Sequence, residues 1–262
     1  MEIVSGEMKI MKITFAGSQN QESKRHYAAT YLIDEILAVD AGTLGLINLD
    51  TQKQIRHVLL SHAHADHIAT LPIFLDNVYQ SCEQCPQVHA HPDVLTALRT
   101  HVFNGCLWPD IEKIAREESP VVQFHELQDQ QTFKIEQYEI TPVLLNHGVT
   151  TLGFLIDDGI SALAIVSDTS PTESIWNVVS KVERLKAVIL EASFPNSLDW
   201  LANKSMHLTP AMLKLELKKL PRNVTVIATH LKPAYHDEIV EELRQLHDPF
   251  LSIGEPGQVY EF

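Results

Sequence analysis

The fold of this chain is decided by the stretch Leu60-Ser61-His62-Ala63-His64-Ala65-Asp66-His67. Three histidines and an aspartate follow directly after an apolar segment that reads as a strand. Alternate residues of an extended chain point the same way, so His62 and His64 can converge on one metal ion. Asp66 and His67 stand where the chain turns into a helix and can face a second ion. A loop of solvated histidines would not require this spacing, so the pattern indicates a metal site.

Further donors of the same kinds follow other predicted strands. They are His147 after 141–145, Asp168 after 161–167 and His230 after 224–229. Any one of them alone would be an ordinary polar loop residue. Together they repeat one context, in which an apolar strand delivers a ligand to the same edge of a sheet. Two ions bound by nitrogen and carboxylate ligands need about this many donors.

Strands and helices alternate along the rest of the chain. Strands are predicted at 8–15, 27–39 (interrupted at Asp34-Glu35), 56–60, 88–91, 121–127, 132–145, 151–156, 161–167, 187–191 and 224–229, with a short terminal strand and a hairpin turn at 157–159. Helices are predicted at 67–79 with Asp66 as the cap, and at 93–103, 171–182, 209–220 and 233–246. Runs of strands followed by helices, twice over, favour an α/β fold of two β-sheets back to back with helices outside.

The composition is that of a globular protein. Its 262 residues, 45% hydrophobic and 21% charged, suffice for the core of a single domain, predicted over 1–262. No apolar run approaches the ~20 residues that span a bilayer. Glu2 and Glu7 stand where a secretory signal would be basic and then apolar, so we expect a cytoplasmic protein with no membrane partner.

Charge and cysteine content narrow the range of partners. The formal net charge of −14 weighs against a nucleic-acid-binding face but not against a small anionic substrate beside divalent cations. The three cysteines cannot form a disulfide framework. Cys82 and Cys85 have the spacing of a zinc knuckle, but without a second pair they are interpreted as ordinary thiols.

In its order of donors, the chain resembles the metallo-β-lactamase superfamily over nearly its whole length. The turn Asp40-Ala41-Gly42 is also typical of that superfamily. The resemblance implies an αββα sandwich of two mixed β-sheets flanked by helices, with the metals at one rim. It assigns His62, His64 and His147 to a first ion, Asp66, His67 and His230 to a second, and Asp168 to a bridge between them. The expected cofactors are two divalent metal ions, with Zn²⁺ preferred over Mn²⁺ or Fe²⁺.

Two residues between Asp168 and His230 indicate a branch of the superfamily. Glu191 ends a predicted strand in Glu-Ala-Ser, and His207 stands in His-Leu-Thr. In phosphodiesterase branches, including ribonuclease Z, a glutamate and a histidine in similar settings form a pair. A histidine oriented by a carboxylate is a suitable proton donor near neutral pH. The alternative without a catalytic role is that Glu191 is a buried carboxylate at the end of a strand and that the segment at His207 caps a helix.

Three stretches together resemble class II cyclic-nucleotide phosphodiesterases. They are 103–110, 191–197 and 207–210, and the chain departs from that family at Ala65, Thr70 and Met206, none of them a ligand. The resemblance implies hydrolysis of 3′,5′-cyclic nucleotides (cAMP or cGMP) to 5′-monophosphates, with Asp66, Glu191 and His207 as catalytic residues. It also implies a homodimer acting on a small anionic phosphodiester. Phe103 and Trp108 are either core residues or a flat wall for a purine.

Three alternatives remain at this point. A ribonuclease Z-like tRNA 3′-processing endonuclease would share the Glu191–His207 pair, but it usually carries a basic arm that is not found here. A thioesterase or lactonase of the same fold would not need the pair. A non-catalytic metal-binding scaffold would keep the ligands and lack turnover.

Overall fold

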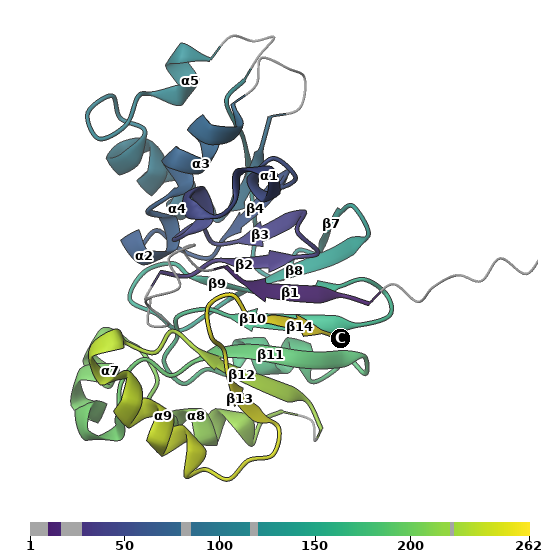
Figure 1. Ribbon diagram of the computed structural model, residues 1–262, viewed down its shortest axis with the longest axis vertical. Coiled ribbons are helices and arrows are strands. Elements are labelled where there is room, and N and C mark those ends of the chain that lie inside the picture. Colours follow the sequence, from purple (N-terminus) through teal and green to yellow (C-terminus); the bar gives the residue numbers. More distant parts are fainter. Residues whose placement is uncertain (1–9, 17–27, 80–84, 116–119, 221–222) are drawn as a thin grey trace, which may run out of the picture.

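The strands pair into two sheets that lie face to face (Figure 1). The computed structural model describes residues 10–16, 28–79, 85–115, 120–220 and 223–262, and over these residues each sheet has seven strands. In order across it, the first sheet contains β14 (Val259–Glu261), β1 (Lys12–Phe15), β2 (Tyr31–Ile33), β3 (Leu37–Val39), β4 (His57–Leu60), β5 (Gln87–Ala90) and β6 (Gln123–Glu126). The second contains β13 (Leu251–Ile253), β12 (Thr225–Thr229), β11 (Leu185–Glu191), β10 (Ala162–Val166), β9 (Leu152–Asp157), β8 (Tyr138–Leu144) and β7 (Phe133–Ile135).

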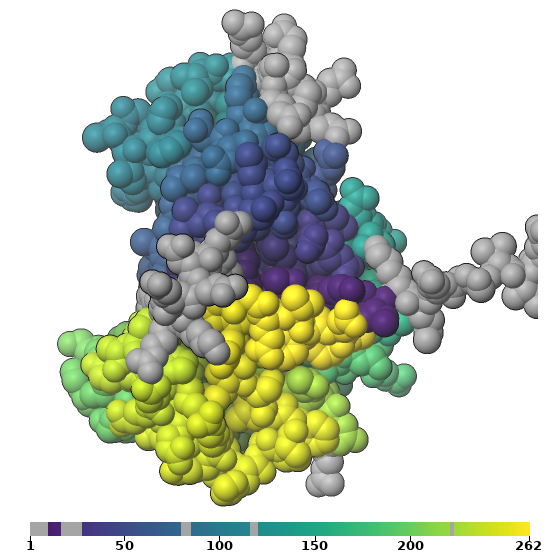
Figure 2. All heavy atoms as spheres, viewed as in Figure 1, coloured from purple at the N-terminus to yellow at the C-terminus, as the bar shows by residue number. Residues whose placement is uncertain are grey.

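Both sheets are mixed. In the first, β14 to β3 are antiparallel neighbours and β3 to β6 are parallel neighbours. In the second, β7 to β10 are antiparallel and β10 to β13 are parallel. The last strand, β14, pairs with β1, and Figure 2 shows the yellow C-terminal residues lying against the purple β1. The predicted pair of mixed sheets is confirmed.

Helices cover the outer faces of both sheets (Figure 1). On the side of the first sheet these are η1 (Leu44–Leu46), α1 (Leu49–Gln52), α2 (Ala65–Ile68), α3 (Leu71–Val78), α4 (Pro92–Ala97), the π-helix η2 (Leu98–Val102) and α5 (Ile111–Ile114). On the side of the second they are α6 (Ser174–Val179), η3 (Asn196–Leu198), α7 (Asp199–Ser205), α8 (Pro210–Leu217), η4 (Pro233–Tyr235) and α9 (His236–Arg244).

Apolar side chains fill three layers. In β4, Leu59 points into the core between the sheets, whereas Val58 and Leu60 pack outward beneath the helices. In β11, Ile189 points inward and Leu190 outward in the same way. Because both faces of each sheet are covered, such strands are apolar throughout rather than alternating, as is usual for buried parallel strands.

The helix predicted over 67–79 is wrong in its bounds. The structure has α2 and α3 with a break at Thr70, whose hydroxyl donates to Ala41 O at 2.8 Å. Pro72 explains the break, because a proline is tolerated in the first turn of a helix but not in its interior. The capping role expected of Asp66 is also wrong, since His64 is the N-cap and Asp66 lies in the first turn of α2.

Other boundaries differ more locally. The predicted strand over 132–145 is two strands, β7 and β8, separated by a turn in which Glu136 has a φ of 50°. Helix α7 was not expected, because its short and largely polar sequence buries only Ala202. The expected single terminal strand is two strands, β13 and β14, one in each sheet. Glu2, Glu7, Cys82 and the first residues of the predicted strands 8–15 and 27–39 lie outside the described residues.

Met206 ends α7 in a left-handed conformation, with φ 59° and ψ 50°. Because this conformation costs an L-residue about 1–2 kcal/mol and glycine little, we expect Met206→Gly to raise the free energy of unfolding by about 1 kcal/mol. Denaturant unfolding measures the change. As a control, Lys204→Gly places glycine at an exposed right-handed position of the same helix and should lower stability by about 0.5–1 kcal/mol. Equal losses in both variants would contradict the expectation.

Candidate metal centre

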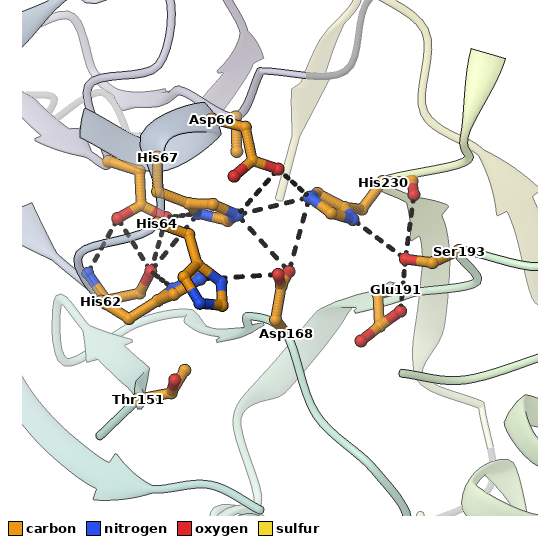
Figure 3. Close-up of polar contacts among 12 residues, drawn as sticks. His62, His64, Asp66, His67, Thr151, Asp168, Glu191, Ser193 and His230 are labelled. Carbon is orange, nitrogen blue, oxygen red and sulfur yellow. Dashed lines mark hydrogen bonds and ion pairs between the residues drawn. The ribbon is translucent and has the colours of Figure 1, made fainter. Parts of the chain in front are cut away.

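Strand ends from both sheets meet at one rim. His62 and His64 follow β4 of the first sheet. Strands β8 and β10 lie on either side of β9 and run in the same direction, and β12 is parallel to them, so their carboxyl ends point to one edge of the second sheet. His147, Asp168 and His230 follow these three strands. All the predicted ligands therefore lie at the junction of the two sheets. Figure 3 shows six of them there: His62, His64, Asp66, His67, Asp168 and His230.

The first group of donors is His62, His64, His147 and Asp168. One ligand atom from each lies within 4.8 Å of the others. His64 Nδ1 is 3.4 Å from His147 Nε2, and His62 Nε2 is 3.5 Å from Asp168 Oδ2. Two nitrogens bound to one tetrahedral zinc ion at ~2.0–2.1 Å would stand roughly 3.3 Å apart. The spacing fits an ion between them.

His62 gives an independent test of the fit. Over the described residues, its Nε2 is buried and lacks a hydrogen-bond partner. A buried nitrogen without a partner is rare and points to a missing neighbour such as an ion. Burial lowers the pKa of His62 well below its ordinary value, so the ring is neutral, the form that binds metal. The donor set therefore suits a divalent cation.

The second group is Asp66, His67 and His230. His230 Nε2 is 3.2 Å from Asp66 Oδ2 and 3.3 Å from His67 Nε2. Asp168 lies between the two groups, with Oδ2 facing His62 and Oδ1 3.5 Å from both His67 Nε2 and His230 Nε2 (Figure 3). This is the placement that a bridging carboxylate requires.

The carboxylates of the centre remain ionised. Burial acts to raise the pKa of Asp168, but the charges of His230 and His67 hold it well below its usual range. Burial likewise opposes ionisation of Asp66, whose pKa is nevertheless lowered by its hydrogen bond with His230 and the charge of His67. Both side chains are therefore already anionic and can bind a cation without first losing a proton.

Asp40 orients His67, a role that the sequence did not reveal. Its Oδ2 accepts from His67 Nδ1 at 2.7 Å, which leaves Nε2 facing the centre. The backbone N–H of Ser61 donates to Asp40 Oδ1 at 2.8 Å. Asp40 has a φ of 61°, a strained conformation of the kind that persists at functional sites. Gly42 is required beside it, because a Cβ there would lie 2.0 Å from Asp66 O.

The outer nitrogens of two other histidines are held in the same way. His147 Nδ1 donates to Met206 O at 2.9 Å. His230 Nδ1 lies 2.9 Å from Ser193 Oγ, and Ser193 was not predicted as part of the site. In each case the far ring nitrogen is anchored and the near one faces the centre, as is usual around metal ligands. The sequence features near these anchors were the Asp-x-Gly turn, the Glu-Ala-Ser stretch and the departure from the family at Met206.

The predicted pair of Glu191 and His207 is brought together. His207 Nδ1 is 2.9 Å from Glu191 Oε1. Glu191 is buried and also accepts the backbone N–H groups of Thr169 at 2.8 Å and Leu208 at 3.2 Å. Burial acts to lower the pKa of His207, but the Glu191 carboxylate outweighs it, so that pKa is raised. His207 is thus held in one orientation and kept able to carry a proton.

His207 has a second geometric option. One of its nitrogens lies within 4.8 Å of ligand atoms of Asp168 and His230, a third grouping able to hold an ion.

Phe103 lies elsewhere: it is 4% exposed and packs beneath the helices of the first sheet, with Trp108 partly buried against the same cluster. Phe103 is therefore a core residue and does not form a wall of the metal site.

The chain is similar to known proteins in both sequence and structure. A family model described as the Beta-lactamase superfamily domain matches residues 37–231. A curated relative, 3′,5′-cyclic-nucleotide phosphodiesterase 1 of Saccharomyces cerevisiae, is 27% identical over 230 residues, covering 71% of this chain and 60% of the relative. The match thus spans less than two thirds of the yeast protein's length.

Solved structures share the fold. Unliganded yeast PDE1 superposes with a TM-score of 0.79 at 20% identity, covering 96% of this chain and 99% of that one. The metallo-beta-lactamase fold protein YhfI from Bacillus subtilis gives 0.73 at 20% identity, covering 97% and 99%. The short form of human tRNase Z gives 0.62 at 17% identity, covering 95% and 98%. The predicted αββα fold is confirmed.

In the part of the chain that the structure describes, no helix combines the length and apolar character needed to cross a membrane.

Proposed function

The chain belongs to the β-lactamase superfamily, and from this premise we propose that it is a dinuclear metal-dependent phosphodiesterase that hydrolyses 3′,5′-cyclic nucleotides to 5′-monophosphates. The observation that carries the proposal is the contact between His207 Nδ1 and Glu191 Oε1 at 2.9 Å, beside the two groups of donors. A thioesterase or lactonase has no need of a proton donor built in this way. The yeast relative supports the choice of a cyclic nucleotide.

The donor groups suggest where two divalent ions would bind. His62, His64 and His147 would hold one, Asp66, His67 and His230 the other, and Asp168 would contact both. Zn²⁺ suits this set of imidazoles and carboxylates, with Mn²⁺ or Fe²⁺ as alternatives. When bound, the ions would neutralise the phosphate oxygens and activate water.

The chain's own residues would handle the protons. Asp66, ionised at the rim, would accept a hydrogen bond from the attacking water and so orient it towards phosphorus. As the bond between the water oxygen and phosphorus forms, the bond between phosphorus and the 3′ oxygen breaks. One proton of the water stays on the phosphate and the other leaves to solvent, from which His207 is later reprotonated. His207, held at Nδ1 by Glu191, would give the proton on Nε2 to that departing oxygen. General acid assistance of this kind is typically worth ~10²–10⁴ in rate.

Location and assembly are part of the same proposal. The enzyme would act in the cytoplasm, as one hydrolase domain over 1–262 and as a homodimer. The net charge of −14 favours a small phosphodiester over nucleic acid.

One preparation loaded with metal tests the proposed substrate. We expect kcat/KM for cyclic AMP or cyclic GMP to exceed that for bis-p-nitrophenyl phosphate, a generic diester. A rate on cyclic nucleotides no better than on the generic diester would contradict the substrate. Cleavage of a tRNA precursor in preference to both would favour the ribonuclease Z-like alternative. Preference for a chromogenic lactone or thioester would favour those esterases, and bound metal without any hydrolysis would favour a scaffold.

A further inference from the structure

Lys232 lies beside the metal centre and has no role in the chemistry above. It follows the donor His230 in Thr-His-Leu-Lys-Pro, after the end of β12. Its backbone N–H donates to Ser193 O at 3.3 Å, and the preceding Leu231 is buried. Pro233 fixes the backbone on the other side. Lys232 therefore starts from a rigid point next to the loop that carries Ser193.

The Lys232 side chain lies over an aromatic ring of the site. Its Nζ is 4.9 Å from the centroid of Phe194, within the range of a cation–π contact. The Phe194 ring is buried and lies edge-on to His207, with centroids 5.8 Å apart. Phe194 thus contacts both the Lys232 ammonium and His207, the proposed proton donor.

The charges that act on Lys232 come from the centre itself. Burial lowers the pKa of the ammonium, while the carboxylates of Asp66, Asp168 and Glu191 act in the opposite direction. These three groups come from separate elements: α2, the segment after β10, and the end of β11. The Lys232 side chain is half-buried and its ammonium lies over Phe194, the ring that contacts His207, so the cation is held beside the site.

Phosphodiesters and neutral esters differ in what they need from such a site. A phosphodiester keeps a negative charge on its non-bridging oxygens from binding to product, whereas a lactone or thioester carries none. An ammonium group is a compact donor suited to a phosphate oxygen. The carboxylates of Asp66, Asp168 and Glu191 lie at the same site, so a cation there would add to the attraction that bound divalent ions exert on an anionic substrate.

We propose that Lys232 is a substrate-binding residue that holds a non-bridging phosphate oxygen next to His207 and so selects anionic phosphodiesters over neutral esters. The inference rests on the proposed function for its substrate, and it assigns the selection of that substrate to one side chain. The cation–π contact with Phe194 holds the ammonium near His207.

The test compares Lys232→Met, Lys232→Arg and Lys214→Met. Lys214 is an exposed residue of α8, so its variant removes the same charge from the surface. Binding of 5′-AMP and of inorganic phosphate to the metal-loaded proteins is measured by calorimetry, together with KM and kcat for cyclic AMP and bis-p-nitrophenyl phosphate. Metal content is measured for each protein.

We expect Lys232→Met to weaken binding of 5′-AMP and to raise the KM for both phosphodiesters, each by roughly 10- to 100-fold. Its metal content should be unchanged. Lys232→Arg should recover most of the loss, and Lys214→Met should behave as the unmodified protein. Unchanged 5′-AMP affinity in Lys232→Met, loss of metal from it, or a fall in kcat at constant KM would each overturn the inference. The inference would also be overturned if the unmodified protein bound neither 5′-AMP nor phosphate.

The two proposals fail separately. Hydrolysis of cyclic nucleotides that is unaffected by Lys232→Met would leave the proposed function standing and remove the role of Lys232. Anion binding that depends on Lys232, in a protein without phosphodiesterase turnover, would keep the binding role and remove the proposed function.

Discussion

Replacing His64 with alanine is expected to remove bound metal and nearly all hydrolytic activity. His64 supplies one of the four donors of the first group, and its Nδ1 stands 3.4 Å from His147 Nε2. Changes in residues that only orient a ligand typically cost 10- to 100-fold, so loss of a ligand should cost more than ~100-fold. Elemental analysis and turnover of bis-p-nitrophenyl phosphate measure the two effects.

A matched histidine serves as the control for this experiment. His101 is exposed on the π-helix η2, away from the donor groups, and His101→Ala should keep both metal and turnover. Full metal occupancy in His64→Ala would contradict the assignment of His64 as a ligand.

Replacing His207 with alanine should lower turnover of a cyclic nucleotide by ~10²–10⁴ while leaving metal content intact. The reason is that the 3′ oxygen of ribose is a poor leaving group and needs a proton as it departs. Nitrophenolate leaves without one. The same variant should therefore lose much less activity on bis-p-nitrophenyl phosphate than on cyclic AMP.

The comparison between substrates separates the two options for His207. Loss of metal together with equal loss of activity on both substrates would make His207 a ligand, in the third grouping with Asp168 and His230. Glu191→Gln is a useful companion, because it keeps the shape of the partner and removes its charge. It should reproduce the substrate-dependent part of the defect in weaker form.

The part of the site that could be predicted is the part encoded locally. His62 and His64 follow from spacing along one extended segment, and the structure places them in one group. The strand-end positions of His147 and His230 indicated the same edge, but assigning His147 to the first ion and His230 to the second required the family resemblance, because no local pattern relates donors on different strands of two sheets. The structure brings them together as the resemblance implied.

The residues that orient the donors could not be predicted, because their contacts depend on strand register. Asp40 reaches His67 because β3 and β4 pair with Val39 opposite Leu59, which sets Asp40 beside Ser61. Nothing in the sequence near either residue specifies that register. At Met206 the departure from the family was visible in the sequence, but the left-handed backbone conformation of this residue was not.

The donors are divided between the two sheets. The segment after β4 contributes His62, His64, Asp66 and His67, and the second sheet contributes His147, Asp168 and His230. Under the proposed assignment each ion would cross-link the two sheets, because each group takes ligands from both of them. The free energy of metal binding would then also stabilise the packing of one sheet on the other. A cell short of metal would hold an idle enzyme that is also more easily opened, so the protein's lifetime against proteases would follow the metal supply.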